Sequence, residues 1–231
     1  MNAVWHDIEC GAYAEDLPLW RELAEAAAGP VLDVGAGTGR VALDLARRGH
    51  EVVALDLDGA LLAVLRERGA GLPVDTVVAD ARSFALDRRF DLILAPMQTV
   101  QLLAGRQDAF LRCAAAHLAP GGVLAAALAA PPEYDGAVRP LPDVLERDGW
   151  LWCSQPTAIR RVAAGLAIER RRETVSPAGE RTVERDEVVL DVVDPADLEA
   201  AGAALGLRVL PRRRIAETDD HVGSEVVMLG G

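Results

Sequence analysis

The stretch VLDVGAGTGR, residues 31 to 40, constrains the fold of this chain more than any other. Its first four residues predict a short buried strand, and the apolar positions that begin at Val41 predict a helix. Three glycines separate the two elements: Gly35, Gly37 and Gly39. Because glycine lacks a Cβ, the chain can turn tightly and bring backbone N–H groups close to a ligand. The free N–H groups at the start of the helix, and its dipole, favour an anionic group.

The same order of strand, turn and helix recurs along the next hundred residues. It predicts strands at Glu51–Asp58, Val74–Ala79, Phe90–Ala95 and Val123–Ala129, with helices at Gly59–Arg68 and Arg106–Leu118. Two further strands, Leu207–Leu210 and Val226–Leu229, follow a helix at Pro195–Gly206. The sequence therefore predicts an α/β fold, a doubly wound and mostly parallel seven-stranded sheet with helices on both faces.

The rhythm changes after the fifth predicted strand. Prolines mark an irregular connection, and β-branched residues then predict antiparallel strands within Thr157–Val175 and Glu180–Val193. We interpret this β insert as a cap that shapes the acceptor pocket or forms a homodimer. The chain is predicted to be one domain over residues 1–231. Its parts are an N-terminal helical lid (1–29), a cofactor-binding core (30–130), the insert (131–193) and the last helix and strands (194–231).

Composition excludes several classes of partner. The chain has 36 acidic and 24 basic residues and a formal charge of -12, whereas nucleic-acid binding requires a basic surface. Its three cysteines show no C-x-x-C spacing, which predicts neither disulfides nor a metal site and favours a reducing cytoplasm. The apolar stretch Gly122–Ala130 is too short to cross a membrane, and the first residues lack the basic start of a signal peptide. We therefore expect a cytoplasmic protein.

Two acidic residues lie at the carboxyl ends of predicted strands: Asp56 is near the end of the second, and Asp80 directly follows the third. In open parallel sheets, ligands bind outside the carboxyl ends of the strands, where the topology switches. Asp56 is therefore expected to face the same crevice as the glycine turn, where its carboxylate can accept hydrogen bonds from both hydroxyls of a ribose.

These features together resemble the class I, Rossmann-like S-adenosylmethionine-dependent methyltransferases over roughly residues 31–130. The resemblance implies S-adenosylmethionine as cofactor, with the glycines along its methionine moiety, Asp56 on the ribose, and Asp80 with Ala81 on the adenine. Asp33 would hold the motif together. The turn Pro96-Met97-Gln98-Thr99 departs from the N/D-P-P-Y/F motif of amino methyltransferases acting on nucleic acid, which argues against base methylation. The implied cofactor-binding residues are Tyr13, Asp33, Gly35, Ala36, Gly37, Gly39, Asp56, Leu57, Asp80, Ala81, Ala95 and Met97.

Three side chains are candidate catalytic residues that would contact the methyl acceptor: His221 and Tyr13 as bases, and Gln98 to orient the acceptor. If the sixth strand is parallel to the others, the loop Glu217–Ser224 lies over the crevice and brings Asp219, Asp220 and His221 to it. A solvated turn, a packing tyrosine and a turn-capping glutamine are the structural alternatives. His6 is a further candidate base, with a surface position as its alternative. The arginines at 160, 161 and 170–172 could bind an acidic substrate or line a solvated strand edge.

The predicted function is methyl transfer from S-adenosylmethionine to a small-molecule acceptor by in-line displacement. A nicotinamide-dependent oxidoreductase is the first alternative, although Arg40 stands where the G-x-G-x-x-G dinucleotide motif has its third glycine. A cofactor-binding regulator without catalysis is the second. The sequence leaves the acceptor and the attacked atom open.

Overall fold

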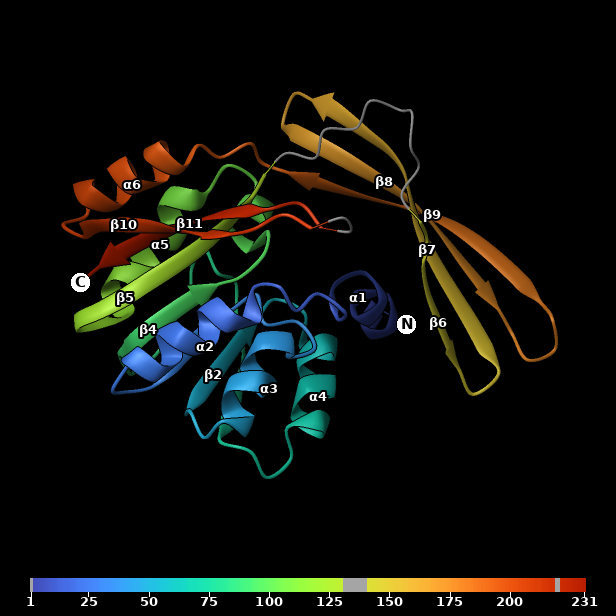
Figure 1. Cartoon of the computed structure of the whole chain (residues 1–231), viewed down its shortest axis with the longest axis horizontal. Helices are drawn as coiled ribbons and strands as arrows, with labels where there is room; N and C mark the ends of the chain where they lie inside the picture. Colours follow the sequence, from blue (N-terminus) through green and yellow to red (C-terminus); the bar gives the residue numbers. More distant parts are fainter. Residues whose placement is uncertain (1, 131–140, 219–220) are drawn as a thin grey trace.

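The structure is a computed structural model that describes residues 2–130, 141–218 and 221–231, and it contains two separate sheets (Figure 1). The larger sheet has the strand order β10-β11-β5-β4-β1-β2-β3. Its strands are β1 (Val31–Val34), β2 (Val52–Asp56), β3 (Val74–Val78), β4 (Phe90–Ala95), β5 (Leu118–Ala129), β10 (Arg208–Ile215) and β11 (Ser224–Gly230). The helices are α1 (Asn2–Cys10), α2 (Leu17–Ala26), α3 (Arg40–Arg47), α4 (Gly59–Arg68), α5 (Gln107–His117) and α6 (Pro195–Ala204), with a 3-10 turn η1 (Thr99–Leu102).

The larger sheet is doubly wound, as the sequence predicts. Strand β1 pairs in parallel with both β2 and β4, and only β11 runs antiparallel to its neighbours β5 and β10. Alternate residues of the central strands point into two buried clusters. One cluster packs under α2, α3 and α4, and the other packs under α5 and α6. The strand order reverses beside β1, which places a crevice at the carboxyl ends of β1 and β4.

Strand β5 begins earlier than the sequence predicts. It starts at Leu118, directly after α5, so the Pro120-Gly121-Gly122 segment lies within the strand. The pairing with β4 shifts register between Phe90 and Leu92, and Gly121 has a φ of 79°. This irregularity accommodates a proline and two glycines that would break a regular strand.

The insert is a four-stranded antiparallel sheet, as expected for its β-branched segments. Its strands follow chain order as β6 (Asp143–Arg147), β7 (Trp150–Val162), β8 (Gly165–Val175) and β9 (Arg181–Leu190). The predicted segment 157–175 is a hairpin rather than one strand. Gly165 stands at its turn with a φ of 144°, and a Cβ there would collide with the backbone of Leu190.

Helix α1 lies within the predicted N-terminal helical segment (1–29), which had no bounds for it, and it connects the body of the larger sheet to the four-stranded sheet. Asp7 accepts hydrogen bonds from Arg68 on α4 and, at 2.7 Å, from Thr38 after the glycine turn. On the other side, Glu9 accepts from Arg172 on β8 at 2.8 and 2.9 Å and from Ser154 on β7 at 2.7 Å. The helix therefore carries one carboxylate anchored to each sheet.

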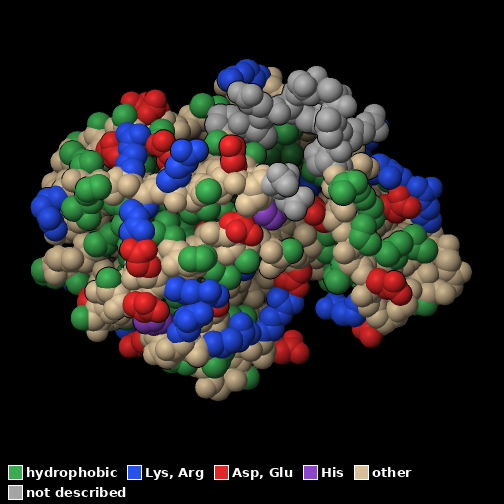
Figure 2. Space-filling view, in the orientation of Figure 1, with side chains coloured by type: hydrophobic (Ala, Val, Ile, Leu, Met, Phe, Trp, Pro, Cys, Tyr) green, Lys and Arg blue, Asp and Glu red, His purple; other side chains and the backbone are tan. Residues whose placement is uncertain are grey.

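In the orientation of Figure 1, the molecular surface has a hollow between the part that contains the larger sheet and the lobe that carries the four-stranded sheet (Figure 2). Arginine and acidic side chains are interspersed on it, without a continuous basic area. Within the part of the chain that the structure describes, no helix combines the length and apolar character needed to cross a membrane.

Candidate active site

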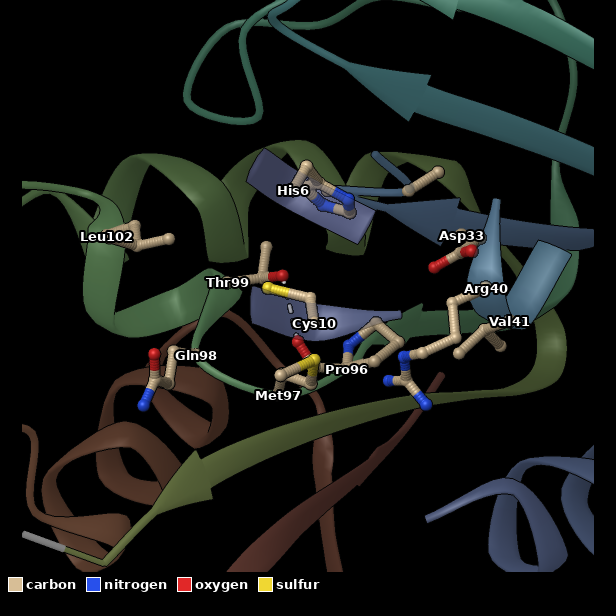
Figure 3. Close-up of a pocket in the computed structure, with 12 residues that line it drawn as sticks. His6, Cys10, Asp33, Arg40, Val41, Pro96, Met97, Gln98, Thr99 and Leu102 are labelled. Atoms are coloured by element: carbon tan, nitrogen blue, oxygen red, sulfur yellow. Dashed lines mark hydrogen bonds between the residues drawn. The ribbon is translucent and has the colours of Figure 1, made fainter. Parts of the chain in front are cut away.

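A pocket lies at the carboxyl ends of β1 and β4, beneath α1 (Figure 3). Asp33 and Arg40 lie at one end of it, and Gln98 and Leu102 lie at the other. Thr99 stands between these ends, where its hydroxyl donates a hydrogen bond to the carbonyl of Pro96 at 2.9 Å. The pocket therefore runs from the glycine turn to the loop that follows β4.

The glycine turn adopts the backbone that its sequence requires, with φ values of 74°, 55° and 96° at Gly35, Gly37 and Gly39. The N–H groups of its three glycines and of Ala36 donate hydrogen bonds within the protein. Those of Gly35 and Ala36 donate to the Leu55 carbonyl at 2.8 and 3.0 Å, and that of Gly39 donates to the Ala36 carbonyl at 2.9 Å. A Cβ on Gly39 would meet Leu43 and Leu65, so this glycine lets α3 and α4 pack.

Two side chains of opposite charge, Asp33 and Arg40, line the pocket beside the glycine turn. Asp33 is fully buried, and neither of its carboxylate oxygens has a well-formed hydrogen bond among the described residues. Burial raises the pKa of Asp33 to about 7, against the opposing effect of Arg40. The Arg40 guanidinium donates to the buried Asp16 at 2.5 and 2.7 Å and to the Tyr13 carbonyl at 3.0 Å. The pocket thus has a carboxylate and a guanidinium at one end.

Asp56 closes β2 and holds two backbone segments together. Its carboxylate accepts from the N–H of Gly37 at 2.8 Å and from the N–H of Asp58 at 2.8 Å. Each carboxylate oxygen accepts one of these bonds and has a second lone pair left for a ligand. The structure therefore brings Asp56 to the glycine turn.

Asp80 lies two residues beyond β3 and is already engaged. Arg82 donates to its two oxygens through Nε and Nη2 at 2.8 and 2.6 Å, and through its backbone N–H at 2.8 Å. These hydrogen bonds lower the pKa of Asp80 to about 2. A ligand at Asp80 must share the carboxylate with Arg82, a residue that the sequence analysis did not single out.

Helix α1 forms the roof of the pocket, with His6 and Cys10 facing inward. A Cβ on Gly37 would collide with the His6 imidazole, so His6 packs directly on the glycine turn. Burial lowers the pKa of His6, which corrects the alternative of a surface histidine. Burial also raises the pKa of the Cys10 thiol to about 11, which keeps it protonated and unreactive.

The structure brings two of the three acceptor-contact candidates together. His221 lies edge-on to the Tyr13 ring, with centroids 4.8 Å apart, and its backbone N–H donates to Thr218 at 3.1 Å. Gln98 is at the other end of the pocket, away from Asp33 and Arg40. Asp219 and Asp220 lie outside the described residues.

The remaining predicted cofactor residues differ in their exposure. Leu57 is 67% exposed beyond β2, Ala81 is partly exposed, and Ala95 is fully buried at the end of β4. Met97 lines the pocket with a φ of 55°, a backbone conformation that non-glycine residues rarely adopt. Eight pocket residues were given no cofactor role by the sequence analysis: His6, Cys10, Arg40, Val41, Pro96, Gln98, Thr99 and Leu102.

The described residues contain no group of three or more His, Cys, Asp or Glu side chains placed to hold a metal ion.

Comparison with known proteins supports the geometry. Residues 31–122 match the family described as "Methyltransferase domain". The cypemycin N-terminal methyltransferase of Streptomyces sp is 34% identical over 109 residues, which are 46% of this chain and 44% of that protein. The dTDP-3-amino-3,6-dideoxy-alpha-D-glucopyranose N,N-dimethyltransferase of Streptomyces fradiae is 37% identical over 101 residues, 42% of this chain and 38% of that protein. The aligned segment thus spans less than half the length of each curated relative.

Among solved structures, DesVI of Streptomyces venezuelae superimposes with a TM-score of 0.74. The match covers 98% of each chain at 22% identity, so it supports the fold. The comparisons give no support to a nicotinamide-dependent oxidoreductase. Residues 31–122 are therefore similar to a methyltransferase domain, and the doubly wound fold with its crevice beside the glycine turn is similar to that of DesVI.

Proposed function

We propose that this chain transfers the methyl group of S-adenosylmethionine to an amine nitrogen of a small molecule in the cytoplasm. The observation that carries the proposal is the pair of opposite charges, Asp33 and Arg40, beside the glycine turn. Two curated relatives, 34% and 37% identical, are named for N-methylation of a peptide terminus and of an amino sugar, and a third, 37% identical, is named for O-methylation. The two N-methyltransferases are our reason for proposing nitrogen as the attacked atom. The cysteines in the described structure are free thiols, consistent with a reducing compartment.

The charged residues fit the amino-acid end of the cofactor, which carries an ammonium and a carboxylate. Asp33 offers a buried carboxylate without a well-formed hydrogen bond, and the adjacent Arg40 offers a guanidinium. Asp56, with its remaining lone pairs beside Gly37, would accept from the ribose hydroxyls. Asp80, shared with Arg82, would accept from the adenine amino group, and the next residue, Ala81, would donate its N–H to the ring.

When bound, the cofactor supplies a methyl carbon that is already electrophilic because its sulfur is positively charged. The protein must align the nitrogen lone pair with the carbon–sulfur bond and exclude water. As the nitrogen–carbon bond forms, the electron pair of the carbon–sulfur bond returns to sulfur. Helix α1 supports water exclusion, since His6 and Cys10 cover the pocket from above.

An ammonium acceptor must lose a proton before it attacks, and His221 is the residue we assign to this step. Burial raises the pKa of Tyr13 to about 12, so its phenol stays protonated and serves as a wall for the His221 ring. Gln98 does not titrate, and its amide can only orient an acceptor. His221 is therefore the one side chain among the three candidates with a ring nitrogen that can act as a base.

Calorimetric titration with S-adenosylhomocysteine and with NAD, followed by radiolabelled methyl transfer to a panel of amines, tests the proposal. We expect S-adenosylhomocysteine to bind and NAD not to bind. We also expect the labelled methyl group to be transferred to amines rather than to alcohols. In His221→Ala, transfer should fall at least ten-fold with unchanged cofactor affinity, whereas Tyr13→Phe keeps most of the rate. Binding without transfer to any acceptor would favour a regulatory protein instead.

We also propose that the insert forms a homodimer. The face of the four-stranded sheet turned away from α1 exposes four apolar side chains in a soluble fold: Val144, Leu151, Val183 and Val189. An exposed apolar face on a sheet favours burial against a second copy.

A further inference from the structure

Two arginines on the α1-facing side of β8 have different surroundings. Arg172 is saturated: it donates to Glu9 at 2.8 and 2.9 Å and forms an ion pair with Asp186 at 2.8 Å. Arg170, one step along the same face, has only distant partners. Its Nη1 is 3.8 Å from Asp143 and its Nε is 4.0 Å from Glu9. Nη1 is buried and has no hydrogen-bond partner among the described residues.

Arg170 and Asp143, which lie 3.8 Å apart, are next to the methyl-transfer pocket. Glu9, whose carboxylate lies 4.0 Å from Arg170 Nε, directly precedes Cys10 on α1, and Cys10 lines that pocket. The pair therefore lies beside the wall of the pocket in which the acceptor nitrogen would be methylated.

The charges around the pair indicate what it can bind. Glu9, Asp143 and Asp186 bring three carboxylates against two guanidinium groups, so a carboxylate or phosphate would be repelled. This local balance argues against the acidic substrate that the arginine run suggested. A hydroxyl group, by contrast, can accept from Arg170 Nη1 and donate to Asp143 at the same time. About half of the Asp143 side chain is exposed, so a ligand can reach it.

We propose that Arg170 and Asp143 form the acceptor subsite, in which a hydroxyl of the substrate bridges the two side chains. The enzyme thereby selects a hydroxylated amine of the amino-sugar class over a plain amine. The inference rests on the proposed N-methyl transfer and identifies its substrate class.

The test measures binding, so it does not depend on turnover. Full-length protein saturated with S-adenosylhomocysteine is titrated with 3-amino-3-deoxyglucose and with cyclohexylamine, which carries the same amine on a six-membered ring without hydroxyls. Ligand-observed NMR gives both dissociation constants. The wild type should bind the amino sugar at least ten-fold more tightly. Arg170→Met and, separately, Asp143→Asn should abolish most of this preference, with cyclohexylamine affinity changed less than two-fold.

Arg171→Met is the matched control, because Arg171 is the next residue, points to the opposite face of the sheet and pairs with Glu173 at 2.6 Å. It should keep the preference of the wild type. Unchanged S-adenosylhomocysteine affinity in every variant shows that the fold and the cofactor site are intact. Equal binding of the two probes, no amino-sugar binding, or an undiminished preference in both variants would overturn the inference. Failure to bind S-adenosylhomocysteine would instead overturn the proposed function.

Discussion

At the scale of single residues, Asp33 shows how burial prepares a side chain for a charged ligand. A carboxyl group whose pKa is about 7 is only half ionised at neutral pH, and an ammonium placed beside it favours the ionised form. The unfolded chain ionises Asp33 near pH 4, so its burial lowers the stability of the free protein as pH rises from about 4 to 7. In the proposed function, the ammonium of the cofactor provides the counter-charge and so offsets this cost.

Cofactor affinity should therefore depend on pH. Binding lowers the pKa of Asp33, so the affinity for S-adenosylhomocysteine should rise roughly eight-fold from pH 6 to 7.5, as the carboxylate ionises in the free protein. Calorimetry at several pH values measures this, and buffers of different ionisation enthalpy reveal the released proton. Asp33→Asn should bind more weakly and without the pH dependence. A flat profile in the wild type contradicts the assignment.

Asp56 should contribute to binding through its remaining lone pairs. Replacing Asp56 with Ala removes the acceptor for two backbone N–H groups and for the ribose, and a hydrogen bond to a charged group is worth roughly 1.5–3 kcal/mol. We expect affinity for S-adenosylhomocysteine to fall about ten-fold or more. Asp75→Ala, on the exposed side of the neighbouring strand β3, is the control and should bind normally. Normal binding by the Asp56 variant would remove this residue from the site.

At the scale of elements, the sequence is informative where local pattern and structure agree. Helix α4 and strand β4 have the predicted bounds, because their apolar spacing and their flanking residues are local signals. The bounds of helix α1 were missed because its sequence, NAVWHDIEC, contains few strong helix formers. Its anchors Arg68 and Arg172 lie 61 and 163 residues from their partners on the helix, so the stabilisation is tertiary. Cys10 was missed as a pocket residue for the same reason, whereas His6 was a candidate base in the sequence analysis.

The residues of the site also divide into those that local sequence signals predict and those that depend on tertiary contacts. The sequence placed Asp56 at the crevice, since the end of a parallel strand fixes its position. It did not predict that Arg82 would bind Asp80. It also did not predict that the N–H groups of Gly35, Ala36 and Gly39 would donate hydrogen bonds within the protein. Those contacts depend on side-chain rotamers and on the exact path of the turn, which no spacing rule determines.

Loosening α1 should speed cofactor release. Burial opposes the ionisation of Glu9, but hydrogen bonds from Arg172 and Ser154 lower its pKa. The contact between Glu9 and Arg172 is therefore intact at neutral pH, and it weakens only as pH falls below the usual pKa range of a glutamate. Arg172→Met should increase the dissociation rate of S-adenosylhomocysteine several-fold, as measured by stopped-flow fluorescence. Arg181→Met removes an exposed arginine of β9 and should leave the rate unchanged. Equal rates in the two variants would show that α1 stays closed without its sheet anchor.

At the scale of the whole molecule, the two faces of the four-stranded sheet differ in their side chains. One face carries Arg170 and Arg172 toward α1, and the opposite face exposes Val144 and Val183 in one cross-strand register, with Cys153 and Glu173 between them. In the wild type we expect a dimer by light scattering, since the exposed valines and Leu151 would otherwise remain in water. Val183→Glu should shift the mass toward the monomer, because association would bury an unpaired carboxylate.

The control for this prediction is Val192→Glu, which adds the same charge at an exposed valine beyond β9 and outside the sheet. It should leave the mass unchanged. Because the apolar face lies opposite Arg170 and Asp143, the monomeric Val183 variant should bind S-adenosylhomocysteine and 3-amino-3-deoxyglucose as the wild type does. A wild-type monomer over the full concentration range would contradict the dimer, and loss of amino-sugar binding on dissociation would mean that the two faces of the sheet act together.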